Sequence, residues 1–159
     1  MWRNQLIKIL DLLNENNIVV LDSESYSEVI DTLLELVKPS EKVGDYQSFC
    51  KAITDREKIV STGIGLGLAV PHARHDSVHD FVAAAVLVKN GVEWRSIDDS
   101  PVHFAIMIGS PEDSHKQYLN LLSQIVLFWK KSSEREKILA ANTPNDILEI
   151  MRSYFADKS

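Results

Sequence analysis

Cysteine is nearly absent from this chain of 159 residues, which holds only Cys50. A single cysteine excludes an internal disulfide and a zinc site built from several thiolates, and it suits a reducing compartment. Cys50 falls on a predicted helical face that it shares with Tyr46, Phe49 and Ile53. We interpret it as a small buried apolar residue, with a catalytic thiol as the alternative.

Excess positive charge and long apolar runs are also absent. The chain has 17 Lys and Arg residues against 23 Asp and Glu residues, and its pI of about 5.3 argues against a nucleic-acid partner or an anionic membrane surface. Charges interrupt the amino-terminal run MWRNQLIKILDLLNENN, so it is neither a signal peptide nor a membrane span. We therefore expect a cytoplasmic protein without membrane insertion.

Glycine is sparse as well, yet three of the six glycines form the pattern Gly63-x-Gly65-x-Gly67. This spacing is not that of a dinucleotide-binding fingerprint, and no Walker-type phosphate loop is present, so we expect no cofactor. One interpretation is that these glycines leave a strand face bare, so that backbone or a partner can approach closely. Ordinary close packing of a helix on the sheet is the alternative.

The amino-terminal third of the chain has the pattern of helices around one short strand. Apolar residues at helical spacing predict a first amphipathic helix over 6–13, and the run 17–22 predicts a strand. A second helix is expected after Ser25, which stands at capping-box spacing from Glu28, and Pro39 ends it. A third helix is expected over 45–56.

The middle of the chain changes to strands, and helices then return. Runs rich in glycine, alanine and β-branched residues predict strands over 61–70, 81–88 and 102–109. Asn90-Gly91 predicts a tight turn. Three further helices are expected, beginning near Ser114, with a cap at Ser133 and Glu136, and at Thr143-Pro144. The first of these has the predicted apolar stripe Tyr118, Leu119, Leu122, Ile125, Val126 and Trp129. The order predicts a single α/β domain over 1–159, with a mixed β-sheet flanked by helices on both faces.

His72 follows Pro71 at the end of an apolar run, where packing gives no reason for a histidine. Pro71 fixes its own φ and holds the preceding residue extended, so the backbone entering His72 is stiff. A buried core histidine, a metal ligand together with His75 and His79, and a covalent nucleophile are the three interpretations. Because the zincin-type pattern of histidines and carboxylates is missing, we expect no metal site.

The nucleophile interpretation rests on the chemistry of imidazole. With an ordinary pKa near about 6.5, a histidine is mostly neutral in the cytosol and keeps a free lone pair on one ring nitrogen. Phosphoryl transfer needs little beyond positioning and positive charge, and no nucleotide cradle when the donor is a phosphorylated protein. The candidate cations and donors are Arg56, Arg74, His75 and His115. His115 is expected in the first turn of a helix, where free N–H groups favour an anion.

The run REKIVSTGIGLGLAVPHAR resembles the phosphorylation-site region of type-2 enzyme IIA domains of the bacterial phosphoenolpyruvate-dependent phosphotransferase system. This is the fructose, mannitol and nitrogen-regulatory family. The resemblance is carried by Glu57, by Ile64-Gly65 and by the run 68–73 at the family's spacing. It continues through the strand-like entry IVVLD, the run FVAAAVLV, the run PVHFAIMI and the final helices, so that it covers nearly the whole chain.

The resemblance implies a phosphotransferase with a phosphohistidine intermediate and no cofactor. His72 would accept a phosphoryl group from the histidine phosphocarrier protein and pass it to a cysteine of a cognate IIB component for sugar uptake. Alternatively, the phosphorylation state of His72 would control binding to a regulatory target protein, as in a nitrogen-regulatory IIA module. Arg56 would lie beside the phosphohistidine, and Gly65 and Arg74 are predicted binding residues.

The second histidine of the family pattern is missing from its usual place. Family members have an HLxxLS-like segment, whereas this chain reads YLNLLS, so that Tyr118 stands at the histidine position. His115 lies one helical turn earlier and shares that face. Either His115 or the hydroxyl of Tyr118 would take the position of the second histidine beside His72. Alternatively, Tyr118 packs in the core and His115 is a solvated residue at the start of the helix. We expect His103 to be structural.

Overall fold

A six-stranded mixed sheet forms the centre of the fold in the computed structural model, which describes residues 6–23 and 25–158. Five strands lie in the order β1-β5-β6-β3-β2, and β4 also pairs with β6. Strand β1 pairs in parallel with β5, and β3 and β4 pair in parallel with β6, whereas the pairs β5–β6 and β2–β3 are antiparallel. The strands are β1 Ile18–Leu21, β2 Gly63–Gly65, β3 Leu68–Ala69, β4 His72–Arg74, β5 Val82–Val92 and β6 Val102–Ser110.

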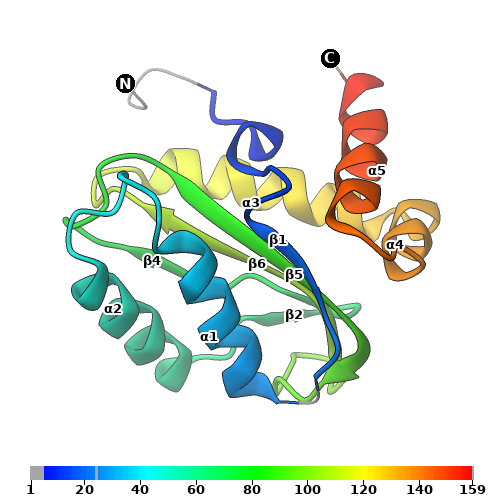
Figure 1. The fold of residues 1–159 in the computed structure, drawn as a ribbon, viewed down its shortest axis with the longest axis horizontal. Helices are drawn as coiled ribbons and strands as arrows, with labels where there is room; N and C mark the ends of the chain where they lie inside the picture. The colour runs from blue at the N-terminus through cyan, green and yellow to red at the C-terminus, as the bar shows by residue number, and fades with distance from the viewer. Residues whose placement is uncertain (1–5, 24, 159) are drawn as a thin grey trace.

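Helices cover both faces of this sheet (Figure 1). One face carries α1 (Tyr26–Val37) and α2 (Tyr46–Ile59). The other face carries the short 3-10 helix η2 (Ile9–Leu12) and the three carboxy-terminal helices. These helices are α3 His115–Lys130, α4 Ser132–Leu139 and α5 Pro144–Ala156. The predicted α/β domain with a mixed sheet between helices is confirmed.

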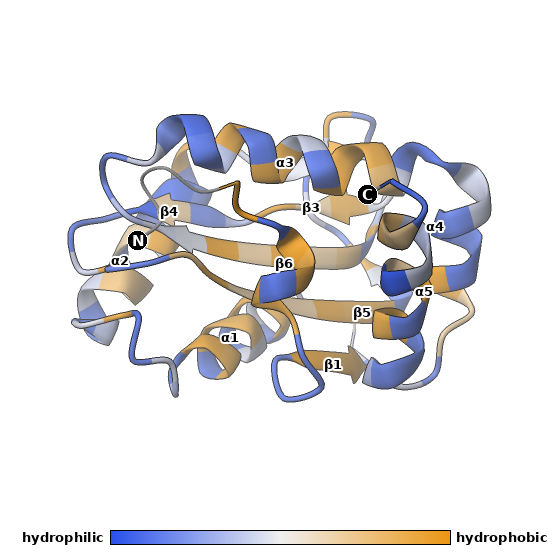
Figure 2. Ribbon diagram, turned by 90° about the horizontal axis from the view of Figure 1, so that it is seen from above, coloured by the Kyte–Doolittle hydropathy of each residue, from blue (hydrophilic) through white to orange (hydrophobic). Residues whose placement is uncertain are grey.

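The central strands are buried on both sides. In β5, Ala83 and Leu87 pack toward α3, while Ala84 and Val86 pack toward α1 and α2. Figure 2 shows the result, with apolar colour along β5 and β6 and hydrophilic colour on much of the outer helix surfaces. A strand covered on both faces reads as a continuous apolar run, which is why 81–88 was predictable from its sequence.

The predicted first helix over 6–13 is wrong within the described residues. The structure has only the 3-10 turn Ile9–Leu12, with extended backbone at Lys8 and Leu13. Gln124 of α3 replaces the missing helical hydrogen bonds, because its side-chain oxygen accepts from the Ile9 N–H at 3.0 Å and its Nε2 donates to the Ile7 carbonyl at 2.7 Å. Tertiary contacts therefore override the helical spacing of the apolar residues.

The next two predicted helices are present. Ser25 caps α1 by accepting from the Glu28 N–H, although the Glu28 carboxylate accepts from Ser23 Oγ and does not return to the cap. Helix α2 begins after Asp45, which caps it, and runs three residues beyond the predicted end at 56. Cys50 is half-buried on α2 and packs against the core, so it is less enclosed than predicted.

The run 61–70 is not one strand, which corrects the prediction. It folds into β2 and β3, an antiparallel hairpin whose turn has positive φ angles at Gly65, Leu66 and Gly67. At Gly63, an added Cβ would lie 2.4 Å from Ser96 Oγ. The glycines thus serve a tight turn and a close approach of the chain to itself.

Asn90-Gly91 does not form the predicted tight turn. Both residues lie within β5, where Gly91 has φ +77° and the pairing with β6 shifts register. The chain continues as a strand to Val92 and reverses in the segment 93–101. His103 of β6 is half-buried, and its Nδ1 lies 3.2 Å from the Val88 carbonyl, a structural contact within the sheet.

The carboxy-terminal helices agree with their predicted positions but not in every detail. The buried face of α3 contains Leu121 and Phe128, whereas Leu119 of the predicted stripe is 48% exposed. Ser133 lies inside α4 and does not cap it. The last helix has the expected start, with a capping box between Thr143 and Asp146. No described helix combines the length and apolar character required to cross a membrane.

Candidate functional site

The candidate site is a cavity at the edge of the sheet, where β4 meets α2 and the start of α3. His72 is the first residue of β4, which pairs with the carboxyl end of β6 and places His72 opposite Ile108. The cavity has a volume of about 530 Å³. Its walls come from three separate stretches of sequence: Ala52 and Arg56, then His72, Ala73 and Arg74, then Glu112, His115 and Tyr118.

A backbone carbonyl determines which nitrogen of the His72 ring carries the proton. Nδ1 lies 3.1 Å from the carbonyl oxygen of Val70. A carbonyl oxygen can only accept, so Nδ1 must be the protonated, donating nitrogen. In the neutral ring the lone pair is therefore on Nε2. Pro71, between the two residues, stiffens the backbone that makes this contact.

The ring of Tyr118 covers one face of His72. The two ring centroids are 4.5 Å apart with an interplanar angle of 26°, a stacked arrangement. Tyr118 is only 5% exposed. Its burial raises the pKa of the phenol to about 12, although the nearby arginines act in the opposite direction. The phenol is therefore neutral near pH 7, and its ring acts on His72 by contact.

The surroundings keep the imidazole neutral. Burial is the largest cause that lowers the pKa of His72 below its ordinary value, and the hydrogen bond to the Val70 carbonyl acts against it. The positive charges of Arg56 and Arg74 lower it further, as does His115 when it is protonated. The site thus combines an uncharged ring nitrogen that has a free lone pair with cations that attract an anion.

Most of the predicted site residues meet in this cavity. His72, Arg56, Arg74, His115 and Tyr118 all line it. Both candidates for the position of the family's second histidine, His115 and Tyr118, line this cavity. Tyr118 is the one whose ring stacks on the imidazole of His72.

Other predicted or considered residues lie elsewhere. Gly65 belongs to the β2–β3 hairpin, and an added Cβ there would lie 3.4 Å from Asp98. His75 follows β4 in a loop, where its Nδ1 accepts from the Ser77 N–H at 3.1 Å. His79 lies against Gly44. Among the described residues, no group of three or more His, Cys, Asp and Glu side chains is placed to hold a metal ion.

The sequence did not point to two residues of the cavity wall. Ala52 lies one turn before Arg56 on α2, and helical spacing could have found it. Glu112 lies in the loop before α3, exposed at the cavity, and puts a carboxylate near the cations. Its only sequence signal is its position three residues before His115.

Removing the ring of Tyr118 is expected to raise the pKa of His72 toward its ordinary value. In Tyr118→Leu the stacked face of the imidazole becomes accessible to water, which favours the charged form. Tyr118→Phe keeps the ring and should leave the pKa of His72 nearly unchanged. An NMR pH titration of His72 measures both. Leu119→Ala, at the exposed neighbour, is the control, and an unchanged His72 in Tyr118→Leu would show that the ring does not shield it.

The fold and the site together define an α/β domain with a histidine of lowered pKa beside two arginines in one cavity. The family model described as "Phosphoenolpyruvate-dependent sugar phosphotransferase system, EIIA 2" matches residues 11–154, and the chain belongs to this family.

The relatives that the chain resembles include a fructose-specific component and a nitrogen regulatory protein. The chain is 32% identical over 149 residues to a fructose-specific EIIABC component of Bacillus subtilis, covering 93% of this chain but only 24% of that much longer protein. It is 26% identical over 135 residues to a nitrogen regulatory protein of Pseudomonas aeruginosa, covering 85% of this chain and 88% of the relative.

Solved structures show the same fold. The nitrogen regulatory protein IIA-Ntr of Neisseria meningitidis matches with a TM-score of 0.82 and 24% identity, over 90% of this chain and 98% of that one. Enzyme IIAMTL of Escherichia coli, in its complex with phosphorylated enzyme IIBMTL, matches with a TM-score of 0.76 and 21% identity, over 89% and 97% of the two chains.

Proposed function

We propose that this chain is a phosphoryl carrier whose His72 accepts a phosphoryl group on Nε2 from the histidine phosphocarrier protein. The single observation that carries the proposal is the hydrogen bond from His72 Nδ1 to the Val70 carbonyl, which leaves Nε2 as the nitrogen with a lone pair. The lone pair forms the new P–N bond while the bond to the donor's nitrogen breaks. Arg56 and Arg74, which line the same cavity, supply positive charge for the phosphoryl oxygens.

The acceptor in this proposal is a cysteine of a cognate IIB component, which makes the chain a step in sugar uptake. Family membership supports it. So does the Escherichia coli neighbour, which was solved in complex with phosphorylated enzyme IIBMTL. The proposed compartment is the cytoplasm, which suits a relay fed by phosphoenolpyruvate and a chain with one cysteine.

A labelling experiment tests the first step. After incubation with phosphoenolpyruvate, enzyme I and the histidine phosphocarrier protein, the chain is expected to gain one phosphoryl group that is lost in acid. NMR of the imidazole nitrogens should then show the phosphorus bonded to Nε2 of His72, with Nδ1 still protonated. A chain that stays unlabelled, or whose label survives acid, would contradict the proposal, and a label on Nδ1 would contradict the assigned nitrogen.

A regulatory module is the second candidate, favoured by the likeness to the nitrogen regulatory protein of Pseudomonas aeruginosa. In that function the phosphorylation state of His72 controls binding to a target protein, and no sugar is transported. The phosphorylated chain distinguishes the two when mixed with candidate IIB components. Rapid transfer to a IIB cysteine supports the uptake function. A target protein that binds one phosphorylation state of the chain, with no transfer to any IIB, supports the regulatory function.

A further inference from the structure

The cavity around His72 presents hydrogen-bonding groups that the described part of the chain leaves unused. His72 Nε2 has no hydrogen-bond partner within residues 6–23 and 25–158, and it is not among the buried atoms without a partner, so it is accessible. The guanidinium groups of Arg56 and Arg74 form no ion pair with any carboxylate of those residues. With a volume of about 530 Å³, the cavity has room and free groups for a small ligand.

The charges of this cavity favour an anion. Arg56 and Arg74 contribute positive charge, against the single carboxylate of Glu112. His115, the first residue of α3, adds positive charge when it is protonated. Arg74, Glu112 and His115 are exposed and Arg56 is partly exposed, so water and small ions reach these groups. Guanidinium groups match the oxygens of an oxyanion by charge and by geometry.

Two acceptors among these cations narrow the choice to an oxyanion that still carries hydrogen. Nδ1 of His72 holds its hydrogen toward the Val70 carbonyl, so Nε2 of the neutral ring can only accept. The ionised carboxylate of Glu112 can also only accept. Sulfate has no hydrogen near neutral pH and would set lone pairs and negative charge against both groups. Dihydrogen phosphate has two P–OH groups and can donate one to each.

We propose that the unphosphorylated chain binds dihydrogen phosphate reversibly in this cavity. The two unprotonated phosphate oxygens accept hydrogen bonds from Arg56 and Arg74. The two P–OH groups donate to His72 Nε2 and to the Glu112 carboxylate. Sulfate binds more weakly because it leaves these two acceptors unpaired and is repelled by the carboxylate.

Bound phosphate occupies the place that the donor's phosphoryl group must reach on His72. Free phosphate therefore inhibits phosphorylation in competition with the phosphorylated carrier protein, and charging of the chain falls as the phosphate concentration rises. This inhibition rests on the phosphoryl transfer proposed above. The binding itself does not, since it needs only the unmodified His72 and the charged side chains around it.

An NMR titration of the whole chain with inorganic phosphate tests the binding. Phosphate is expected to shift the Nε2 signal of His72 in a saturable manner, because Nε2 gains a hydrogen-bond donor. Sulfate at matched ionic strength should bind at least about tenfold more weakly, the cost of leaving an acceptor unpaired. A phosphate titration without a saturable shift at His72, or equal affinities for the two anions, would overturn the proposal.

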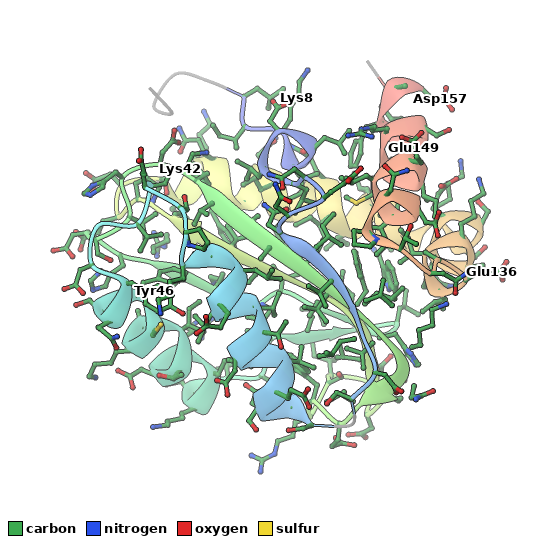
Figure 3. The ribbon with its side chains drawn as sticks, in the orientation of Figure 1. Lys8, Lys42, Tyr46, Glu136, Glu149 and Asp157 are labelled. Carbon is green, nitrogen blue, oxygen red and sulfur yellow. The ribbon has the colours of Figure 1, made fainter. Side chains whose placement is uncertain are left out.

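Two variants assign the binding to the named groups. Glu112→Gln, at an exposed position, removes the negative charge and supplies an amide donor. The ratio of phosphate affinity to sulfate affinity should fall at least about fivefold in this variant. Arg74→Met should weaken phosphate binding at least about tenfold. Glu136→Gln on α4, far from Tyr46 of α2 in Figure 3, is the matched control and should change neither value. An unchanged ratio in Glu112→Gln, or unchanged phosphate binding in Arg74→Met, would overturn the proposal.

A labelling experiment separates the phosphate site from the proposed transfer. The donor is carrier protein phosphorylated beforehand, so that enzyme I is absent. Phosphate at ten times its dissociation constant should slow labelling about tenfold at low donor concentration, and excess donor should restore the rate. Labelling at full rate in the presence of that phosphate concentration would overturn the proposal. A chain that binds phosphate selectively but is never labelled would support the phosphate site and contradict the phosphoryl transfer.

Discussion

No phosphate is expected on His72→Gln after incubation with phosphoenolpyruvate, enzyme I and the histidine phosphocarrier protein. Glutamine is close to histidine in size and polarity, but its amide nitrogen has no available lone pair for attack on phosphorus. The loss should reach the background of the assay, because His72 is the proposed acceptor; label that remained on the variant would point to His115, the other histidine that lines the cavity. Phosphate content is measured by intact mass and by radioactive label.

The matched control is His75→Gln, three residues along the chain. His75 is a histidine in a loop next to β4, and its Nδ1 is engaged with Ser77. Its replacement should leave labelling at the wild-type level. Phosphate that remains on His72→Gln but disappears from His75→Gln would move the acceptor to His75.

Arg56→Met is expected to slow phosphoryl transfer by about 10²-fold, the usual cost of removing one group that stabilises a developing negative charge. Arg56 lies in the last turn of α2 and lines the cavity with His72. Methionine keeps an unbranched side chain and the helix-forming tendency but has no charge, so the fold should be unaffected. The rate is measured by rapid-quench labelling with the phosphorylated carrier protein as donor.

A second measurement separates a role in the site from a general defect. Since the charge of Arg56 lowers the pKa of His72, Arg56→Met should raise that pKa toward its ordinary value in an NMR titration. Arg152→Met is the control: Arg152 pairs with Glu149 at 2.9 Å on α5 and should affect neither measurement. Equal transfer rates in the wild type and in Arg56→Met would show that Arg56 does not assist the reaction.

Local sequence patterns predicted the parts of the fold that local forces decide. Capping residues and apolar spacing located α1, α2 and α5, and two-sided burial made β5 and β6 visible as apolar runs. The errors arise where a distant part of the chain decides. Gln124 of α3 holds the segment that was predicted as the first helix. The pairing of β5 with β6 carries the strand through Asn90-Gly91 as an irregularity, although the same two residues form a tight turn in many hairpins.

The site was predictable where its residues are close in sequence and only in part elsewhere. The run around Pro71 and His72 and the arginine before Glu57 were found from the motif. Whether His115 or Tyr118 stands beside His72 depends on how α3 lies over β4, and helical spacing alone does not fix that. A cavity of about 670 Å³, lined by Tyr26, Glu57 and Trp94 among others, was not foreseen, since α1, α2 and the segment after β5 must come together before it exists.

The hydrogen bond from His72 Nδ1 to the Val70 carbonyl also determines how many protons the His72 ring carries before and after the proposed transfer. When Nε2 takes the phosphoryl group, Nδ1 keeps its hydrogen, and the ring becomes a phosphorylated imidazolium that the carbonyl oxygen stabilises. When the group moves on, the ring departs as the same neutral imidazole from which it began. No proton has to enter or leave His72 in either direction, so charging and discharging need neither a general acid nor a general base at this residue. In the proposed transfer, the carbonyl of Val70 would thus let His72 gain and lose the phosphoryl group without any change in the protons that its ring carries.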